Sequence, residues 1–325
     1  MIKNNLKDNS IFYKNNYNEV FQMKITLLGS LGNINRLVIP RLIADGHEVT
    51  VVTSRQERAT AITALGATPA VGTMTDLAFL TTQFTGRDVV YLMISGTSPD
   101  LFASAQQQAT IFQAAIRASH VQKVVNLSSI GAQDAHSGSL YAYHFIEDAL
   151  TNLSDVDVAF VRPTGFYNNL YANLASVHSD HAIYANIPAT VQRKYVDPAD
   201  IADVVYALVS QTPTGKTIRY VVSDTFTGTE MIAAFSTALG FDVRLVEISD
   251  QQYADALRQN GIPESIIGPF VKSSQLQRQP SEMYADLIQH PVHDGHVKLA
   301  DFAQKFARAF NDGDHAPQAH TIATK

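Results

Sequence analysis

Gly29-Ser30-Leu31-Gly32-Asn33-Ile34 is the stretch that decides the fold of this 325-residue chain. It follows a short apolar run at residues 24–28 and opens a segment with helical apolar spacing at residues 34–45. A strand that leads through a glycine turn into a helix exposes backbone N–H groups beside the positive end of the helix. We therefore predict a phosphate-binding turn, in which Gly29 makes the tight turn and Gly32 lets a pyrophosphate approach.

The segment after this helix predicts which dinucleotide is bound. Residues 48–53 have the pattern of a second strand, and Ser54 and Arg55 follow it. An acidic residue near this point holds the ribose 2′-hydroxyl of NAD, whereas an arginine suits the 2′-phosphate of NADP. No Asp or Glu lies between Val49 and Gln56. We expect Ser54 and Arg55 to bind NADP(H) in preference to NAD(H), with Arg58 assisting; a merely solvated Arg55 is the alternative.

The usual fingerprint has a third glycine where this chain has Asn35. That glycine normally lets the helix lie close to the strand. We expect either that the helix lies slightly farther from the strand or that the Asn35 side chain points sideways. The dinucleotide prediction is weakened by this departure but stands.

Composition excludes several other classes of protein. The formal net charge is −6, which argues against binding to a nucleic-acid backbone. The chain has no cysteine, which excludes disulfides, thiol nucleophiles and cysteine metal sites. It shows neither an apolar run of roughly 18 residues nor a secretion signal. We expect a cytoplasmic protein with no nucleic-acid or membrane partner.

Strands and helices alternate from residue 23 to about residue 163. Residues 88–94 form a continuous apolar run, which is typical of a strand buried on both faces of a parallel sheet. The expected strands are 24–28, 48–53, 69–71, 88–94, 123–127 and 156–161, and the expected helices are 34–45, 56–65, 77–83, 101–119 and 140–151. This alternation predicts an α/β fold with a doubly wound parallel sheet, the Rossmann architecture.

Beyond Pro163 the pattern is less regular. It predicts helices at 200–209, 228–239, 250–259, 263–271 and 299–310, and strands at 217–222 and 243–248. We expect these pieces to form a smaller, irregular α+β lobe that closes a substrate pocket at the carboxyl edge of the sheet.

The organisation we expect has four parts. Residues 1–22 are a flexible extension, 23–165 the dinucleotide-binding core, 166–311 the remainder of the core with the substrate lobe, and 312–325 a disordered tail. A partner-binding arm that uses Phe12, Tyr13 and Tyr17 is the competing interpretation of the first part.

Several later motifs resemble one family. They are the strand end Asn126-Leu127-Ser128-Ser129-Ile130-Gly131, Glu147 with Leu150, the stretch from Arg162 to Leu170, and the stretch from Tyr195 to Asp203. With the glycine turn and Arg55, they make residues 23–310 similar to the NmrA-like family, an atypical branch of the short-chain dehydrogenase/reductase superfamily. The resemblance implies NADP(H) binding. The family's members include quinone and azo reductases, aromatic ether and isoflavone-type reductases, and redox-sensing regulators with little or no catalysis.

Residues at the carboxyl ends of the strands are expected to line the cofactor, because ligands of doubly wound folds bind there. The strand-end residues that we assign to cofactor binding are Ile94, Ser95, Gly96, Ser128, Pro163 and Thr164. We expect Ser128 to contact the nicotinamide. Capping of the following turn is the alternative role for Ser128 and Ser129.

The catalytic tyrosine–lysine pair of typical relatives is absent. Tyr141 is followed four residues later by Phe145, and Tyr143 by Glu147. Alignment of Glu147 with the family's glutamate places Tyr143 in the lysine slot, with His144 beside it. We expect Tyr143 to hydrogen-bond the cofactor ribose and His144 to donate a proton; two ordinary helix-face residues are the alternative.

Three further signals are set aside. Pro291 and Gly295 would break any helix that could align His290, His293 and His296. We therefore expect a surface loop here rather than a metal site. Ser128 lacks the glycine-flanked elbow of a hydrolase nucleophile. Asp197 and Asp200 are expected to cap and start the next helix.

The function that we predict is an NADPH-dependent reductase of a small, apolar, conjugated acceptor such as a quinone or azo compound. Direct hydride transfer needs neither a flavin nor a metal. A non-catalytic NADP(H)-sensing regulator that acts through protein partners is the alternative, and a homodimer is left open. A sugar-nucleotide epimerase is disfavoured because it depends on the absent tyrosine–lysine pair.

Overall fold

The structure of the chain, a computed structural model, describes residues 22–94 and 99–312. The predictions for Ser95 and Gly96, for the extension before residue 22 and for the tail after residue 312 therefore lie outside the described residues. No described helix is long and apolar enough to cross a membrane.

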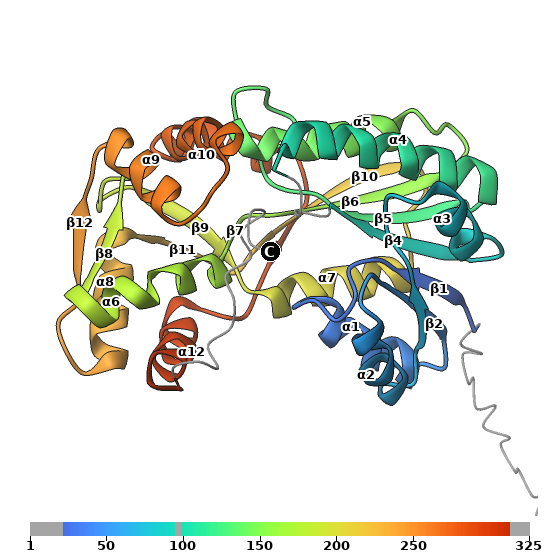
Figure 1. The fold of residues 1–325 in the computed structure, drawn as a ribbon, viewed down its shortest axis with the longest axis horizontal. Coiled ribbons are helices and arrows are strands. Elements are labelled where there is room, and N and C mark those ends of the chain that lie inside the picture. Colours follow the sequence, from blue (N-terminus) through green and yellow to red (C-terminus); the bar gives the residue numbers. More distant parts are fainter. Residues whose placement is uncertain (1–21, 95–98, 313–325) are drawn as a thin grey trace, which may run out of the picture.

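An eight-stranded parallel sheet forms the centre of the molecule, in the order β3-β2-β1-β4-β5-β6-β10-β13 (Figure 1). Every adjacent pair is parallel. The strands are β1 (Lys24–Leu27), β2 (Glu48–Thr53), β3 (Thr68–Val71), β4 (Val89–Met93), β5 (Lys123–Leu127), β6 (Asp157–Pro163), β10 (Lys216–Val222) and β13 (Val292–Asp294). The order from β3 to β6 is that of a Rossmann fold, so the predicted doubly wound sheet is confirmed.

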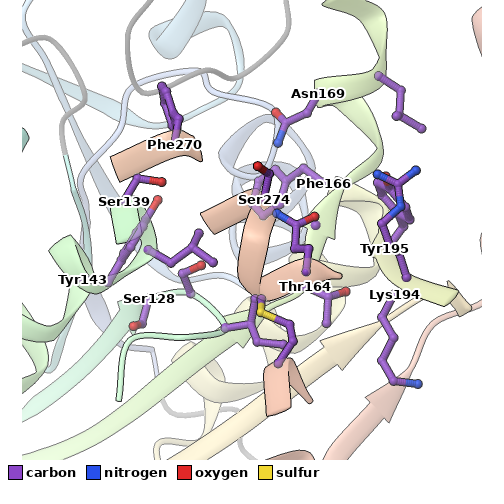
Figure 2. A pocket seen from close by; sticks show the side chains of 18 of the residues that line it. Ser128, Ser139, Tyr143, Thr164, Phe166, Asn169, Lys194, Tyr195, Phe270 and Ser274 are labelled. Atoms are coloured by element: carbon purple, nitrogen blue, oxygen red, sulfur yellow. The ribbon is translucent and has the colours of Figure 1, made fainter. Parts of the chain in front are cut away.

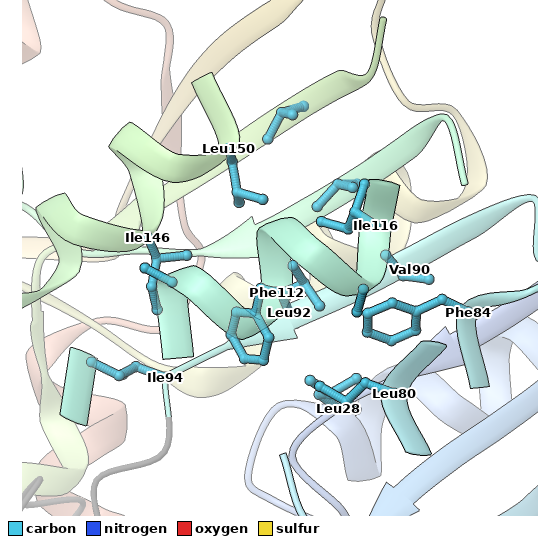
Figure 3. Close-up of a cluster of buried hydrophobic side chains, with 14 of the residues drawn as sticks. Leu28, Leu80, Phe84, Val90, Leu92, Ile94, Phe112, Ile116, Ile146 and Leu150 are labelled. Carbon is cyan, nitrogen blue, oxygen red and sulfur yellow. The ribbon is translucent and has the colours of Figure 1, made fainter. Parts of the chain in front are cut away.

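Helices cover both faces of this sheet (Figure 1). One face carries α3 (Leu77–Phe84), α4 (Leu101–Ser119) and α5 (His144–Thr151), and the other carries α1 (Asn35–Ala44), α2 (Ala59–Ala64) and α7 (Pro198–Ser210). Alternate residues of β4 supply the two cores. Val90 and Leu92 pack with Phe112 of α4 in one core (Figure 3), while Val89 and Tyr91 pack in the other. Burial of both faces explains the continuous apolar run of this strand.

A second lobe lies beyond the carboxyl edge of the main sheet (Figure 1). Its strands are β7 (Gly165–Phe166), β8 (Ala182–Ala185), β9 (Gln192–Val196), β11 (Asp224–Thr227) and β12 (Arg244–Glu247), in two small sheets ordered β11-β9-β7 and β12-β8. Its helical elements are η3 (Tyr167–Asn173), α6 (Leu174–Asp180), α8 (Gly228–Leu239), α9 (Asp250–Gln259), α10 (Glu264–Gln277), α11 (Pro280–Met283), η4 (Ala285–Ile288) and α12 (Leu299–Asp312).

Stacked aromatic rings form the core of this lobe. The Tyr167 ring lies between those of Tyr195 and Phe302, with centroid distances of 5.7 and 4.6 Å. Phe226 stacks on Tyr195 at 4.8 Å. These rings come from η3, β9, β11 and α12, so they join elements that are far apart in the sequence. The lobe is therefore held together by long-range packing rather than by regular βαβ units.

The structure corrects three of the expected elements. The helix expected at 140–151 is a 3-10 segment, η2 (Gly138–Tyr143), followed by α5, and the helix expected at 56–65 is likewise divided into η1 (Gln56–Arg58) and α2. The surface loop expected around the three histidines is also wrong, because residues 292–294 form the edge strand β13 beside β10. Three residues carry too little periodicity to predict a strand, which here depends on its pairing partner.

Candidate cofactor and substrate site

The glycine turn after β1 has a backbone that only glycine fits at its first position. Gly29 has φ of +98°, and a Cβ there would lie 2.3 Å from the sulfur of Met93. A Cβ on Gly32 would lie 3.2 Å from the carbonyl oxygen of Gly29. Ser30, between them, also has a positive φ of 53°. The tight turn predicted for this stretch is therefore built from a left-handed backbone.

Asn35 occupies the place of the missing third glycine and points back toward the turn. Its side chain is buried, and Nδ2 donates to the carbonyl oxygens of Leu28 at 2.8 Å and Ser30 at 2.9 Å. Its Oδ1 is buried without a hydrogen-bond partner among the described groups. The asparagine thus ties the start of α1 to both sides of the turn, a role that the fingerprint does not predict.

The two arginines of the second crossover lie at the outer side of the turn. Ser30 Oγ donates to Thr53 Oγ1 at 2.9 Å, and Arg58 Nη1 donates to Ser30 Oγ at 3.4 Å. Arg55 and Ser54 are exposed. Both guanidinium groups therefore belong to the end of β2, where the motif places the adenine ribose, but it is Arg58 that contacts the turn.

A cavity of about 600 Å³ runs from the glycine turn to the second lobe. This volume lies within the range of roughly 300–1,000 Å³ typical of small-molecule sites. The predicted residues that line it are Gly29, Gly32, Asn33, Ile34, Ile94, Ser128, Tyr143 and Thr164. The predicted residues that lie outside its lining are Ser30, Leu31, Ser54, Arg55, Pro163 and His144. The structure therefore gathers the glycine turn, the strand ends and the tyrosine at one cavity.

Tyr143 is the predicted catalytic residue that faces the cavity. Figure 2 shows Tyr143 and Ser139 on one side, Tyr195 and Lys194 on the other, and Ser128 and Thr164 at the strand ends. Burial raises the pKa of Tyr143 to about 12. The phenol is therefore protonated at neutral pH and available as a hydrogen-bond donor.

His144 takes a different direction from its neighbour. Its ring stacks on Tyr141 with centroids 4.6 Å apart and planes inclined by 12°. It also meets the Phe145 ring edge-on at 6.2 Å. Consecutive side chains of a helix point about 100° apart, and His144, the first residue of α5, lies outside the described lining of the cavity. The two residues therefore do not share one site.

Ser128 is held by a buried ion pair. Its hydroxyl donates to Glu147 Oε1 at 2.5 Å, and Arg162 donates to both oxygens of Glu147 at 2.9 and 2.6 Å. Burial alone would lower the pKa of Arg162, but the hydrogen bonds and negative charge of Glu147 raise it overall. Because the Ser128 proton is committed to Glu147, the oxygen offers its free lone pairs to the cavity.

The same arginine extends this network into the second lobe. Arg162 Nη1 lies 3.0 Å from both Tyr220 Oη and Asp286 Oδ2, and Tyr220 donates to Asp286 at 2.5 Å. His290 lies 3.4 Å from the same carboxylate. A network of charged groups thus connects α5, β6 and β10 of the core with η4 of the lobe. Glu147 and Arg162 both belong to the motifs that resemble the family, but the sequence did not predict that they contact each other.

The sequence predicted that the second lobe closes a substrate pocket, but it did not predict which residues of the lobe line it. Its lining comes from η3, β8, β9, α8, α9, α10 and α11 together with residues near them, and includes Asn169, Arg193, Lys194, Tyr195, Tyr253, Phe270, Met283 and Tyr284. Asp, Glu and His are absent from the described lining. Arg193 and Lys194, two adjacent cations just before the stretch from Tyr195 to Asp203, were the feature of the sequence from which this part of the lining could have been predicted.

The acidic residues Asp197 and Asp200 have structural partners. Asp197 caps α7 by accepting from the Ala199 backbone N–H at 2.9 Å, as predicted. Asp200 starts the same helix, but it is fully buried and accepts from Ser223 Oγ and from the backbone N–H of His296. Its carboxylate therefore fixes the segment that follows β13.

Asp200, Asp203 and His296 are near enough to one another to hold a cation. Each of them already has a protein partner: the His296 ring lies 2.6 Å from Asp200, and Arg41 lies 2.6 Å from Asp203. His290, by contrast, pairs with Asp286. His290 and His296 therefore lie beside different carboxylates.

The strand order and the cavity at the carboxyl ends of the strands define an α/β protein with a Rossmann-like fold. Within this class, the model of the NmrA-like family matches residues 22–299. The chain belongs to the NmrA-like family, which confirms the resemblance seen in its motifs. No curated protein matches the chain.

Several solved structures share the fold. An NADPH-dependent quinone oxidoreductase from Escherichia coli, complexed with NADPH, has a TM-score of 0.70 at 20% identity over 86% of this chain and 98% of its own. A triphenylmethane reductase from Citrobacter sp., complexed with NADP(H), has 0.71 at 18% identity over 87% and 99%. A nucleoside-diphosphate-sugar epimerase from Staphylococcus aureus has 0.71 at 16% identity over 87% and 100%. At these identities the likeness establishes the fold.

Proposed function

We propose that this protein is an NADPH-dependent reductase that delivers a hydride to a small conjugated acceptor such as a quinone or azo compound. The observation that carries the proposal is one continuous cavity, in which the glycine turn, the strand ends and the Tyr143 phenol face an aromatic-lined lobe. Both the quinone and the triphenylmethane-dye reductases share this fold, which supports the reaction class.

The residues at the turn fit a dinucleotide. The positive-φ turn at Gly29 and the N-terminus of α1 suit a pyrophosphate. Arg55 and Arg58 at the end of β2 suit a 2′-phosphate, which supports NADP(H) over NAD(H). Ser128 and Thr164 would lie along the nicotinamide. When bound, the nicotinamide supplies the hydride.

Tyr143 is the proton donor in this proposal. A hydride added to a quinone carries two electrons and leaves one oxygen as an anion, which takes up one proton to complete the hydroquinone. The Tyr143 phenol is protonated at neutral pH because its pKa is raised to about 12, and it faces the cavity. The tyrosinate left behind regains its proton from water. His144, stacked on Tyr141, has no role in this step.

Oxidation of NADPH by a panel of quinones, azo compounds and enones tests the proposal. Tyr143→Phe should lower kcat about 100-fold, the lower end of general-acid effects, and leave the KM for NADPH unchanged. Tyr141→Phe is the matched control, because this ring stacks on His144 outside the cavity, and it should retain full activity. The raised pKa keeps the donor protonated until pH approaches 12, so Tyr143 should cause no loss of kcat from about pH 6 to about pH 9.

A non-catalytic NADP(H) sensor is the second candidate. One observation favours it: Lys194 is the single lysine in the described lining, and it comes from β9 of the second lobe rather than from the helix of Tyr143. A sensor would bind NADPH, reduce no member of the panel, and change its oligomeric state or pull-down partners between NADPH and NADP⁺. Turnover of any acceptor, or an unchanged set of partners, would reject this candidate.

A further inference from the structure

We propose that the acceptor is an anionic aromatic compound, a planar conjugated ring bearing a carboxylate or sulfonate, and that Arg193 selects it. The inference rests on the proposed reductase function and specifies its substrate class. It replaces the small, apolar acceptor that the NADP-type turn and the apolar C-terminal segments predicted.

The charge of the cavity is the first step. Arg193 and Lys194 are the charged side chains in its described lining, which contains no Asp or Glu. The chain as a whole carries a net charge of −6. A cavity with two cations and no carboxylate in an acidic protein attracts anions, and the low-dielectric walls strengthen that attraction.

Arg193 is the uncommitted member of this pair. Lys194 Nζ already donates to Thr225 Oγ1 at 3.1 Å and lies 5.5 Å from the Tyr284 ring. The Arg193 guanidinium is partly buried, lies 5.4 Å from the centre of the Tyr195 ring, and makes no hydrogen bond or ion pair within the described chain. A partly buried guanidinium without an acid is stabilised when a ligand supplies the counter-charge.

The lack of an acidic partner does not by itself distinguish Arg193. Arg58, Arg87 and Arg219 are likewise partly buried without an acid in the described structure, whereas Arg162 is paired with Glu147. What distinguishes Arg193 is its position, because it is the arginine in the described lining of the cavity.

The position of Arg193 also separates it from the cofactor phosphates. The glycine turn follows β1, whereas β9 joins the main sheet through β7, which continues from β6. β1 and β6 are three places apart in the sheet, or roughly 14 Å at the usual strand spacing. Arg55 and Arg58 lie still farther along, at the end of β2. The cavity thus has one anion-binding end for the cofactor and a second for the acceptor.

The walls around Arg193 define the rest of the ligand. Tyr195, Tyr253, Phe270 and Tyr284 line the substrate end, and such rings favour a flat conjugated partner. Burial raises the pKa of Tyr284 to about 12, so this phenol stays neutral and does not act as an internal counter-ion. A planar guanidinium binds carboxylate or sulfonate oxygens through two parallel N–H groups. The aromatic walls and the guanidinium together therefore favour a ligand that has both a flat ring and an anionic group.

Two matched acceptors test the inference by kinetics, 1,4-naphthoquinone and 1,4-naphthoquinone-2-sulfonate. Arg193→Gln should lower kcat/KM for the sulfonate about 10- to 100-fold and change that for the neutral quinone less than about threefold. Arg193→Lys, which keeps the charge but loses the planar fork, should lie between. Lys272→Gln, an exposed cation on α10 outside the cavity lining, is the matched control and should change neither.

Equilibrium binding separates this inference from the reductase proposal. Naphthalene-2-sulfonate should bind the NADP⁺ complex at least about tenfold more tightly than 2-naphthol, and Arg193→Gln should remove the difference. If no quinone is reduced while this difference is found, the reductase proposal fails and the anion site stands. Equal affinities for the two naphthalenes, or an Arg193→Gln variant that loses NADP⁺ affinity by the same factor, would overturn the inference.

Discussion

The two ends of the cavity are built in different ways. The cofactor end is built on the ends of β1, β4 and β5 and on the positive-φ turn at Gly29. The substrate end consists of side chains carried by η3, β9, α9 and α10, such as Arg193, Tyr253 and Phe270. The cofactor end is therefore fixed mainly by backbone conformation. The substrate end depends on the side chains of the second lobe.

This difference indicates how one fold can serve several acceptors. Side-chain changes on β9 or α10 can alter the ligand without disturbing the parallel sheet, because the lobe has its own aromatic core around Tyr167. Changes at the turn alter the backbone and so affect every ligand that the turn holds. The network of Glu147, Arg162 and Asp286 is one place where the two regions are joined.

The largest effect is expected from breaking that junction with Arg162→Met. The change leaves the buried Glu147 carboxylate without its cation and should lower the free energy of unfolding by about 3–5 kcal/mol. Denaturant unfolding measures the loss. The double variant Glu147→Gln/Arg162→Met should recover part of it, because the buried charge of Glu147 is then removed as well and only the partly buried Asp286 is left without its arginine.

Arg258→Met is the matched control for this prediction. Arg258 also pairs with two carboxylates, Asp255 and Glu264, but all three groups are exposed to solvent. Water screens such pairs, so we expect no measurable change in unfolding. An Arg162 variant as stable as the Arg258 variant would show that the buried network does not join the two regions.

The next largest effect concerns the cofactor end alone. Arg55→Asp should reverse the preference for NADPH over NADH, because it removes one charge-assisted contact and adds repulsion of the 2′-phosphate; NADPH affinity should fall about 10- to 100-fold. Calorimetry with both coenzymes measures this. Arg58→Asp should act similarly, since Arg58 contacts Ser30 of the turn. An unchanged preference in both variants would remove the argument for NADP(H).

The comparison also explains which parts could be predicted from the sequence. The strands β2 and β5 and the helices α4, α8 and α9 were predicted to the residue, because local periodicity and end signals define them. α8, for example, begins with a capping box between Thr227 and Glu230. The turn at Gly29 could also be predicted from the sequence, because its φ of +98° favours glycine and the glycine is visible in the sequence.

The parts that were missed depend on partners that are distant in the chain. β7 has two residues and exists through pairing with β9, and η3 and α6 were not recognised at all. Tyr143 and His144 were placed in one site because the alignment of Glu147 sets them side by side in sequence, whereas only Tyr143 belongs to the described lining of the cavity. Arg193 could not be assigned, because the lack of an acidic partner is a property of the fold rather than of its sequence neighbours.

A smaller effect is expected from Gly29→Ala. At φ of +98° an added Cβ is strained and also meets the Met93 sulfur, so NADPH affinity should fall about tenfold or more. Gly46→Ala is the matched control: it has nearly the same φ, +85°, but its Cβ would have no neighbour within 4 Å. This control should lose some stability and keep full cofactor affinity, as measured by calorimetry. Equal loss of affinity in both variants would show that the effect is global strain rather than the shape of the turn.

The smallest effect is expected from Asn35→Ala. The change removes the two hydrogen bonds that Nδ2 donates to Leu28 and Ser30, but it also removes the buried, unpartnered Oδ1, so the net loss of stability should be about 1 kcal/mol. Asn33→Ala, on the same turn but without a side-chain hydrogen bond in the described structure, should leave stability unchanged in denaturant unfolding. Asn35→Asp should be worse than Asn35→Ala, because it keeps the shape but places carboxylate oxygens against two carbonyls. If the aspartate variant were as stable as the wild type, Asn35 would be filling space, and the turn would hold its shape without it.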